Sequence, residues 1–463
     1  MPVKRVAFFT YSQIESALEL YRFISPLKAA GIEIIPGVES GEAKLEHIAG
    51  ADLVCFQREF SCRFKAYQSV LAEARARGVP VVMDLDDHLL ALPPDHPDRL
   101  AGDFADSLPA LMHALLSADA LTVTTPELKQ ELTPFNPNIF VLPNYLDADF
   151  WRFRQPVLRP ADAQVRILFM GTPTHAPDLA GIAEALINIA RLYGSRVRFG
   201  FFGARPPESL AEFAQVDYQA VQSFDYRHFQ REFLQIEADI ALAPLQDNVF
   251  NRCKSAIKFL EYSALGLPGV YAALPPYIAA VSDGENGFLA GDTQEWEHML
   301  GTLIEDPELC LRMAERAQQD IRRQWLLQDH AGEWSEAYDA IVRAGAKKAG
   351  KTSPMESTLA AAALQLDELR ELTRSRYSRQ DEDLAKQLAE ILQRGGELEA
   401  LSCENHEKSM QIEALQSEIL AKDGQIEDLR NEAVGYANSH SWKLTRPLRA
   451  VNRLFGRLLK KRG

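Results

Sequence analysis

Two lysines and a glutamate follow a short apolar run in the second half of the chain. Residues 240–244 have the composition and length of a strand buried on both faces, so the residues after them are expected at the carboxyl edge of a sheet. Lys254 and Lys258 are four positions apart, which predicts that both lie on one helical face. Glu261 follows on that face, where a carboxylate accepts hydrogen bonds from sugar hydroxyls. A diphosphate linked to a ribose would satisfy all three side chains.

Each of these residues taken singly is an ordinary solvated side chain of an amphipathic helix. The segment 251–268, with the apolar run before it, favours a binding site instead, and it resembles the donor-site signature of bacterial GT-B glycosyltransferases. More narrowly, it resembles family-4-type sugar transferases of surface polysaccharide synthesis.

In that family two glutamates eight positions apart bracket the motif, and they contact the transferred sugar and the ribose, respectively. Glu261 matches the second glutamate, whereas Cys253 stands at the position of the first. A thiol does not accept hydrogen bonds as a carboxylate does. The resemblance therefore implies that Asp247, Asn251 or another polar neighbour contacts the sugar, or that catalysis is impaired. We favour a neighbour, and take Lys258, Glu261 and Asp247 as the candidate catalytic residues.

A second polar loop follows the first strand predicted in the second domain. Gly171 allows close approach of the backbone to a ligand, and Thr172 and His175 offer a hydroxyl and an imidazole. The run resembles the Gly-Ser/Thr-Pro-Thr-His loop of the same transferases; alternatively it is a helix cap and a turn, with Asp178 as a helix N-terminal charge. The predicted donor site comprises Gly171, Thr172, His175, Asn251, Lys254, Ser255, Lys258 and Glu261.

Carboxylates also gather at the end of a strand predicted in the first domain. Asp84, Asp86, Asp87 and His88 invite a magnesium hypothesis. The GT-B resemblance implies no metal, because cationic groups and helix dipoles neutralise the leaving diphosphate. We therefore assign the acids to acceptor binding or to a structural network, with a general base as a further alternative.

Other polar residues follow strands at the same predicted edge. Arg22 and Arg58 would meet an acceptor phosphate if they line the cleft, and are otherwise surface salt-bridge partners. The predicted acceptor site comprises Tyr11, Ser12, Arg22, Arg58, Asp86 and Asp87.

The order of apolar runs predicts two domains. At 463 residues the chain exceeds what one core usually supports. Strands alternate with helices over residues 1–155 and again over 163–343, which predicts an α/β fold of two doubly wound, Rossmann-like domains. The first is the expected acceptor domain and the second the nucleotide-sugar donor domain, with the cleft between their carboxyl edges.

Composition excludes several classes of protein. The net charge of -15 argues against nucleic acid as a partner. Five scattered cysteines suit a reducing cytoplasm. We find no apolar stretch long enough for a spanning helix, and no signal peptide.

The last quarter of the chain differs in character. Residues 344–354 read as a linker, 355–437 as a coiled coil and 441–463 as a basic amphipathic tail without acids. The coiled coil, which predicts a homo-oligomer, rests on a three-four alternation at Leu388, Ile391, Gly395, Leu398, Leu401, Asn405, Lys408, Ile412, Leu415, Ile419, Lys422, Ile426 and Leu429. The alternative is one helix folded back on the core.

The tail 441–463 suits an anionic membrane surface, and 441–449 resembles a tail seen on bacterial polysaccharide glycosyltransferases. The alternative is docking on the acidic remainder of the protein.

The resemblance implies a cytoplasmic enzyme, peripheral on the inner face of the membrane, that moves a hexose-like unit from a nucleoside diphosphate sugar to a glycan or lipid-linked acceptor. It implies retention of the anomeric configuration, without a protein nucleophile or a cofactor. Two alternatives remain open, namely a non-catalytic GT-B scaffold and a sugar-nucleotide epimerase.

Overall fold

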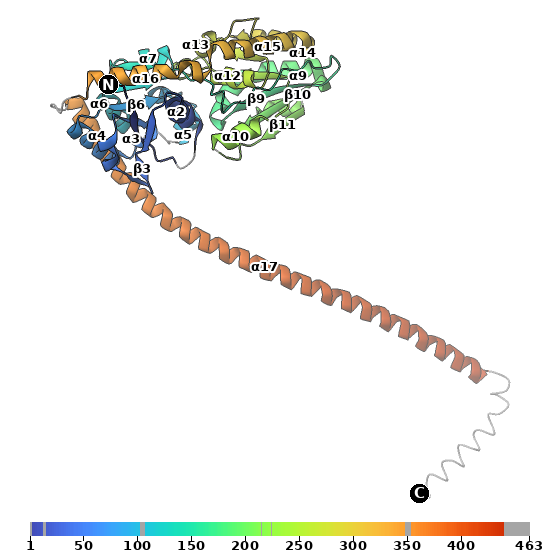
Figure 1. The fold of residues 1–463 in the computed structure, drawn as a ribbon. Coiled ribbons are helices and arrows are strands. Elements are labelled where there is room, and N and C mark those ends of the chain that lie inside the picture. Colours follow the sequence, from blue (N-terminus) through green and yellow to red (C-terminus); the bar gives the residue numbers. More distant parts are fainter. Residues whose placement is uncertain are drawn as a thin grey trace. The chain divides into compact units, whose positions relative to one another are not determined.

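The computed structural model describes residues 2–12, 15–101, 107–213, 215–223, 225–347 and 353–438; within 353–438 it describes the side chains of 353–370, 372–373, 405–406, 408–432 and 434. The chain divides into two compact units, Met1–Glu371 and Leu372–Gly463. The first unit holds both sheets (Figure 1).

The first sheet is parallel throughout and has six strands. Its central strands are buried along their whole length, which explains why they read as continuous apolar runs. The strand order reverses between β1 and β5, so a crevice is expected there, at the carboxyl ends of the strands. In spatial order the strands are β2 (Glu33–Pro36), β1 (Arg5–Phe9), β5 (Leu53–Gln57), β6 (Val81–Leu85), β7 (Ala120–Val123) and β8 (Ile139–Val141).

Short helices connect these strands. A π-helical turn, Leu20–Ile24, joins the first two helices. The helices are α1 (Ala17–Glu19), α2 (Ser25–Ala29), α3 (Arg58–Ser61), α4 (Phe64–Arg77), α5 (Pro97–Ala101), α6 (Leu108–Ser117) and α7 (Pro126–Leu132).

The second sheet repeats the plan with the reversal between β9 and β12. In spatial order its strands are β11 (Gln215–Gln219), β10 (Val197–Gly203), β9 (Val165–Gly171), β12 (Ile240–Ala243), β13 (Gly269–Ala272) and β14 (Phe288–Ala290). Its helices are α8 (Ala176–Gly181), α9 (Ala183–Tyr193), α10 (Tyr226–Phe233), α11 (Val249–Arg252), α12 (Ile257–Ala264), α13 (Pro275–Ile278), α14 (Thr293–Glu305) and α15 (Pro307–Gln324). The prediction of two parallel α/β domains is confirmed.

Sequence reading missed two strand features. The edge strand β11 carries mostly exposed polar residues, so it lacks the apolar run that marks the other strands. The antiparallel pair β3 (Val38–Glu39) and β4 (Glu42–Ala43) is too short for a periodicity.

Helix α16 (Leu327–Ala344) corrects the predicted domain boundary. The range 163–343 assigns it to the second domain, but Trp334, Tyr338 and Ile341 pack into the core cluster of the first, beside Phe8 and Phe23. Figure 1 shows α16 with the first domain. The spacing of the apolar residues in α16 predicts that one face of the helix is buried, but it does not predict which of the two sheets covers that face.

The last helix, α17 (Pro354–Asn438), begins on the first domain, where Ala363 is buried and Glu356 accepts a hydrogen bond from Ser117. Its start takes in the end of the predicted linker 344–354. From 412 to 429 the described apolar side chains are exposed. A helix is present across 355–437, while the coiled-coil pairing stays a prediction. The predicted tail, 441–463, lies outside the described residues.

Among the described residues, no helix is both long enough and apolar enough to cross a membrane.

Candidate functional site

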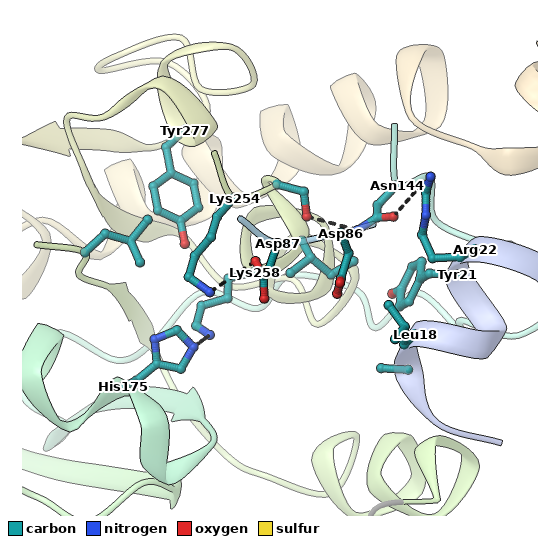
Figure 2. Close-up of a pocket in the computed structure, with 14 residues that line it drawn as sticks. Leu18, Tyr21, Arg22, Asp86, Asp87, Asn144, His175, Lys254, Lys258 and Tyr277 are labelled. Carbon is teal, nitrogen blue, oxygen red and sulfur yellow. Dashed lines mark hydrogen bonds and ion pairs between the residues drawn. The ribbon is translucent and has the colours of Figure 1, made fainter. Parts of the chain in front are cut away.

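The carboxyl edges of the two sheets border an open cavity of about 160 Å³ (Figure 2). Ordinary parallel-sheet geometry accounts for its place, because loops after the strands of both domains meet there. Its polar lining is Tyr21, Arg22, Asp86, Asp87 and Asn144 from the first domain, and His175, Lys254, Ser255, Lys258 and Tyr277 from the second.

The donor segment is folded differently from the prediction. The short helix α11 ends at Arg252, and α12 begins only at Ile257, so Lys254 and Ser255 lie in the intervening turn. The argument that Lys254 and Lys258 share a helical face is therefore wrong. Both ammonium groups nevertheless line the cavity, because the turn brings Lys254 back beside the first turn of α12.

Lys254 and Asp87 form an ion pair across the cavity, with 3.4 Å between Nζ and Oδ1. Burial disfavours the charged form of Asp87, but the positive charges of Lys254 and Arg58 outweigh it and lower the pKa of Asp87. For its neighbour Asp86, burial wins over the attraction of Arg58 and raises the pKa. Two adjacent carboxyls are thus driven in opposite directions, an arrangement typical of sites that handle protons.

Lys258 lies in the first turn of α12 and its side chain is almost fully buried. Burial lowers the pKa of Lys258 to about 8, against the attraction of Glu261. The Nζ atom is 3.2 Å from Nε2 of His175, which lies on the loop after β9. Burial and the charge of Lys258 lower the pKa of His175 to about 4, so this imidazole is neutral near pH 7.

Glu261 is 4% exposed and is not among the described residues that line the cavity. Its Oε1 accepts a hydrogen bond from the hydroxyl of Tyr226, and the oxygen of that hydroxyl is 3.1 Å from the hydroxyl oxygen of Tyr21. Burial raises the pKa of Glu261 to about 7, although the bond from Tyr226 and the charge of Lys258 oppose the shift. The residue predicted to orient a ribose is therefore covered by two tyrosines, one from each domain.

Arg22 is a structural residue at the edge of the cavity. Its guanidinium is buried against Asp84, at 2.9 Å, and Thr122 donates a further hydrogen bond to the same carboxylate. The charge of Arg22 is therefore already compensated. Its neighbour Asn144 donates to Ser255 across the domains at 3.0 Å, a contact that sequence reasoning did not identify.

The other predicted acceptor residues, Arg58, Tyr11 and Ser12, are not among the described residues that line the cavity. Arg58 is 3.4 Å from Asp86 and orients the two acids. Tyr11 stacks on Phe60, and Cζ of Arg63 is 3.9 Å from the centroid of the Tyr11 ring. Ser12 lies next to it, with its amide bonded to Thr10.

Three predicted donor residues serve the loops themselves. Gly171 is needed for packing: an added Cβ would lie 2.8 Å from Cδ2 of His175 and 2.9 Å from Cζ of Phe169. Thr172 is exposed, and its hydroxyl bonds that of Thr174. Asn251 is buried, and its amide bonds Asp178 and the carbonyl of Gln246.

Asp247, which was predicted to contact the sugar, and Cys253, which stands at the position of the first motif glutamate, are also not among the described residues that line the cavity. Asp247 is exposed and paired with Arg252 at 2.5 Å. Cys253 is buried in the core cluster of the first domain, and burial raises its pKa to about 12. Its carbonyl accepts a hydrogen bond from Thr125 of that domain. The position of the first motif glutamate is here a contact between domains.

No group of three or more His, Cys, Asp or Glu side chains is arranged to hold a metal ion within the part of the chain that the structure describes.

Comparison with known proteins identifies the fold. No protein-family profile and no curated protein sequence match the chain. Among solved structures, it is similar to sucrose-phosphate synthase from Thermosynechococcus elongatus, with 13% identity, a TM-score of 0.51 and coverage of 74% of this chain and 100% of that one.

Two further structures are similar at a lower score. Anabaena HepE in complex with UDP-glucose matches with 15% identity and a TM-score of 0.49, over 73% of this chain and 99% of that one. TarM matches with 10% identity and a TM-score of 0.46; the match covers 64% of this chain and spans only 58% of TarM. With two parallel-sheet domains meeting at a cleft, the chain has the GT-B fold.

Proposed function

We propose that this chain is a metal-independent glycosyltransferase that takes a hexose-like unit from a nucleoside diphosphate sugar. The observation that carries the proposal is the pair of ammonium groups, Lys254 and Lys258, in one cavity at the start of α12. The cap residue Ala256 offers no side-chain acceptor, so the first amides of α12 are open to an anion. A fold alone does not fix a function, and these cations are what favour a diphosphate.

The charges suit the departure of a diphosphate. Negative charge grows on its oxygens as the bond to the anomeric carbon breaks, and Lys254, Lys258 and the helix amides stabilise that charge. Lys254 must turn from Asp87 to the ligand, since its ammonium is paired there in the free protein. In the retaining scheme that the resemblance implies, the departing phosphate takes the proton of the incoming hydroxyl.

The opposite wall of the cavity supplies the acceptor side. Asp86 and Asp87 are the carboxylates that face the two lysines, and we assign them to acceptor hydroxyls. Binding of a ribose at Glu261 requires the hydroxyl of Tyr226 to leave, because that hydroxyl already bonds the carboxylate.

A non-catalytic scaffold is the second candidate. Cys253 occupies the place of the first motif glutamate and is buried against the first domain, and Glu261 is covered. Such a protein would bind the nucleotide and transfer nothing.

The cellular role is part of the proposal. The exposed apolar positions of α17, including Ile412, Leu415, Ile419, Ile426 and Leu429, have the spacing of a coiled-coil seam and suit self-association. The basic tail 441–463 suits an anionic membrane surface, where lipid-linked acceptors of polysaccharide synthesis reside. Liposome flotation with and without residues 441–463 tests the tail, and equal flotation rejects it.

A thermal-shift panel of uridine, guanosine and thymidine diphosphates and their sugars tests the donor site. A ligand at ten times its dissociation constant stabilises the protein by about 1.4 kcal/mol. Lys258→Ala should abolish most of that gain, whereas Lys28→Ala, an exposed lysine on α2, should keep it. If no diphosphate stabilises the wild type, the donor site is wrong. Binding without donor hydrolysis or transfer to any acceptor favours the scaffold.

A further inference from the structure

One buried carboxylate links three segments around the cavity. Asp178, in the first turn of α8, is 6% exposed. Its Oδ1 accepts hydrogen bonds from the amide N–H of Gln246 and from Nδ2 of Asn251, both at 2.8 Å. Its Oδ2 accepts from Nδ1 of His175 at 2.8 Å. The loops after β9 and β12 and the helix α11 therefore meet at this group.

The carboxylate determines which nitrogen of His175 carries the proton. Burial opposes ionisation of Asp178, but the hydrogen bonds from His175 and Gln246 outweigh it and lower its pKa, so the group is an acceptor only. Nδ1 of His175 must then be protonated. Because the imidazole is neutral, Nε2 has a free lone pair, and it is the atom that faces Nζ of Lys258.

A neutral partner has a specific advantage for a lysine that binds an anion. A carboxylate at this place would orient the ammonium group and also cancel its charge. The imidazole accepts a hydrogen bond from the ammonium and leaves the charge available. Figure 2 shows His175 and Lys258 joined in this way at the wall of the cavity.

We propose that Asp178 is a positioning residue that fixes the Nδ1–H tautomer of His175, so that Nε2 holds the Lys258 ammonium group toward a bound diphosphate. The proposal rests on the function proposed above for Lys258. Neither the family resemblance nor a sequence motif predicts this role for Asp178.

The variant Asp178→Asn separates this role from a packing role. Its Oδ1 must stay toward Gln246 and Asn251, because both of those groups are donors. The amide NH₂ then replaces Oδ2 and donates to Nδ1 of His175. The imidazole is forced into the Nε2–H tautomer, which points a donor at the Lys258 ammonium group.

We expect this variant to bind inorganic pyrophosphate at least about tenfold more weakly at neutral pH, since a hydrogen bond to a charged group is lost. Its melting temperature should stay close to that of the wild type, because size and two hydrogen bonds are conserved. Asp292→Asn, which changes a helix N-cap on α14, is the matched control and should leave pyrophosphate binding unchanged.

Two readouts distinguish positioning from general support of the loops. Imidazole ¹⁵N spectra, with His175 assigned by its loss in His175→Ala, should show Nδ1–H in the wild type and Nε2–H in Asp178→Asn. In the His175→Ala background, Asp178→Asn should cause a much smaller loss of pyrophosphate affinity, because the main effect of Asp178 passes through the imidazole.

An Nε2–H tautomer in the wild type, or an equal loss of affinity with and without His175, would overturn the inference. Failure of the wild type to bind pyrophosphate would instead refute the proposed function, and the tautomer measurement would still decide the role of Asp178. The charged groups around Lys258 are Glu261, Lys254, Asp178 and Asp87. All variants are compared at one pH so that Glu261, Lys254 and Asp87 contribute equally. Asp178→Asn also removes a negative charge that raises the pKa of Lys258, and the His175→Ala background measures this direct effect separately.

Discussion

If Lys258 binds the diphosphate as proposed, its pKa makes that binding depend on pH in a range where most lysines do not titrate. Burial lowers that pKa to about 8, and only the ammonium form attracts the anion. The protonated fraction of a group with this pKa falls roughly 25-fold between about pH 7.5 and about pH 9.5. Wild-type affinity for pyrophosphate should fall by a similar factor over that interval. The window lies above the pKa of Glu261, about 7, so most of that carboxylate is charged at both ends of the window.

Lys258→Arg isolates the effect, because a guanidinium keeps its charge at both pH values. Titration calorimetry on both proteins gives the ratio of their affinities at each pH. Protonation of pyrophosphate itself affects both proteins alike and cancels from the ratio. We expect the ratio of the variant's affinity to the wild-type affinity to rise roughly 25-fold between the lower and the higher pH. A ratio that stays constant within a factor of two would show that Lys258 is not the group that binds the diphosphate.

Three further substitutions test the site by stability. Burial raises the pKa of Glu261 from 4.5 to about 7, so the contribution of this residue to stability is present below about pH 4.5 and is lost as the pH rises through about 7. Glu261→Gln should therefore stabilise the protein more at about pH 8 than at about pH 5, by no more than about 3 kcal/mol, and its melting temperature should rise accordingly. An equal effect at both pH values would contradict the assignment. Cys253→Glu restores the motif glutamate, but it should lower the melting temperature and produce no gain in transfer. The reason is that the carboxylate would be buried against the first domain, at a cost of more than about 1 kcal/mol. A stable, more active variant would show that residue 253 reaches the sugar. Gly171→Ala should destabilise the protein and weaken pyrophosphate binding, since its methyl group would displace His175 or Phe169, and unchanged binding would rule out the coupling of this loop to Lys258.

The strands and the location of the cleft follow from the sequence for a simple reason. Strands of a parallel sheet covered on both faces must be short and apolar, so β5, β6 and β12 can be read directly. Polar residues that follow such strands arrive at one edge. The prediction that Lys254 and Lys258 lie together was therefore correct although its local argument was wrong. The edge of the sheet, and not a shared helical face, brings the two side chains to the cavity.

What the sequence could not provide depends on contacts between distant residues. Asp178 is 68 positions from Gln246 and 73 from Asn251, and alone it reads as a charge at the start of a helix. Tyr226 is 205 positions from Tyr21, so no local sequence pattern predicts that these two side chains cover Glu261. The apolar spacing in α16 predicts a buried face without the identity of its partner.

The two lysines differ in a way that bears on turnover. Lys258 is held by a neutral imidazole and stays available to an anion, whereas Lys254 is paired with Asp87. In the proposed function, a bound diphosphate therefore competes with Asp87 for Lys254. When Lys254 turns to the ligand, Asp87 loses the nearest charge that offsets its burial, and its pKa must rise. Donor binding would thus release a buried carboxylate with increased proton affinity at the acceptor side, next to Asp86, at the moment when a hydroxyl must bind there.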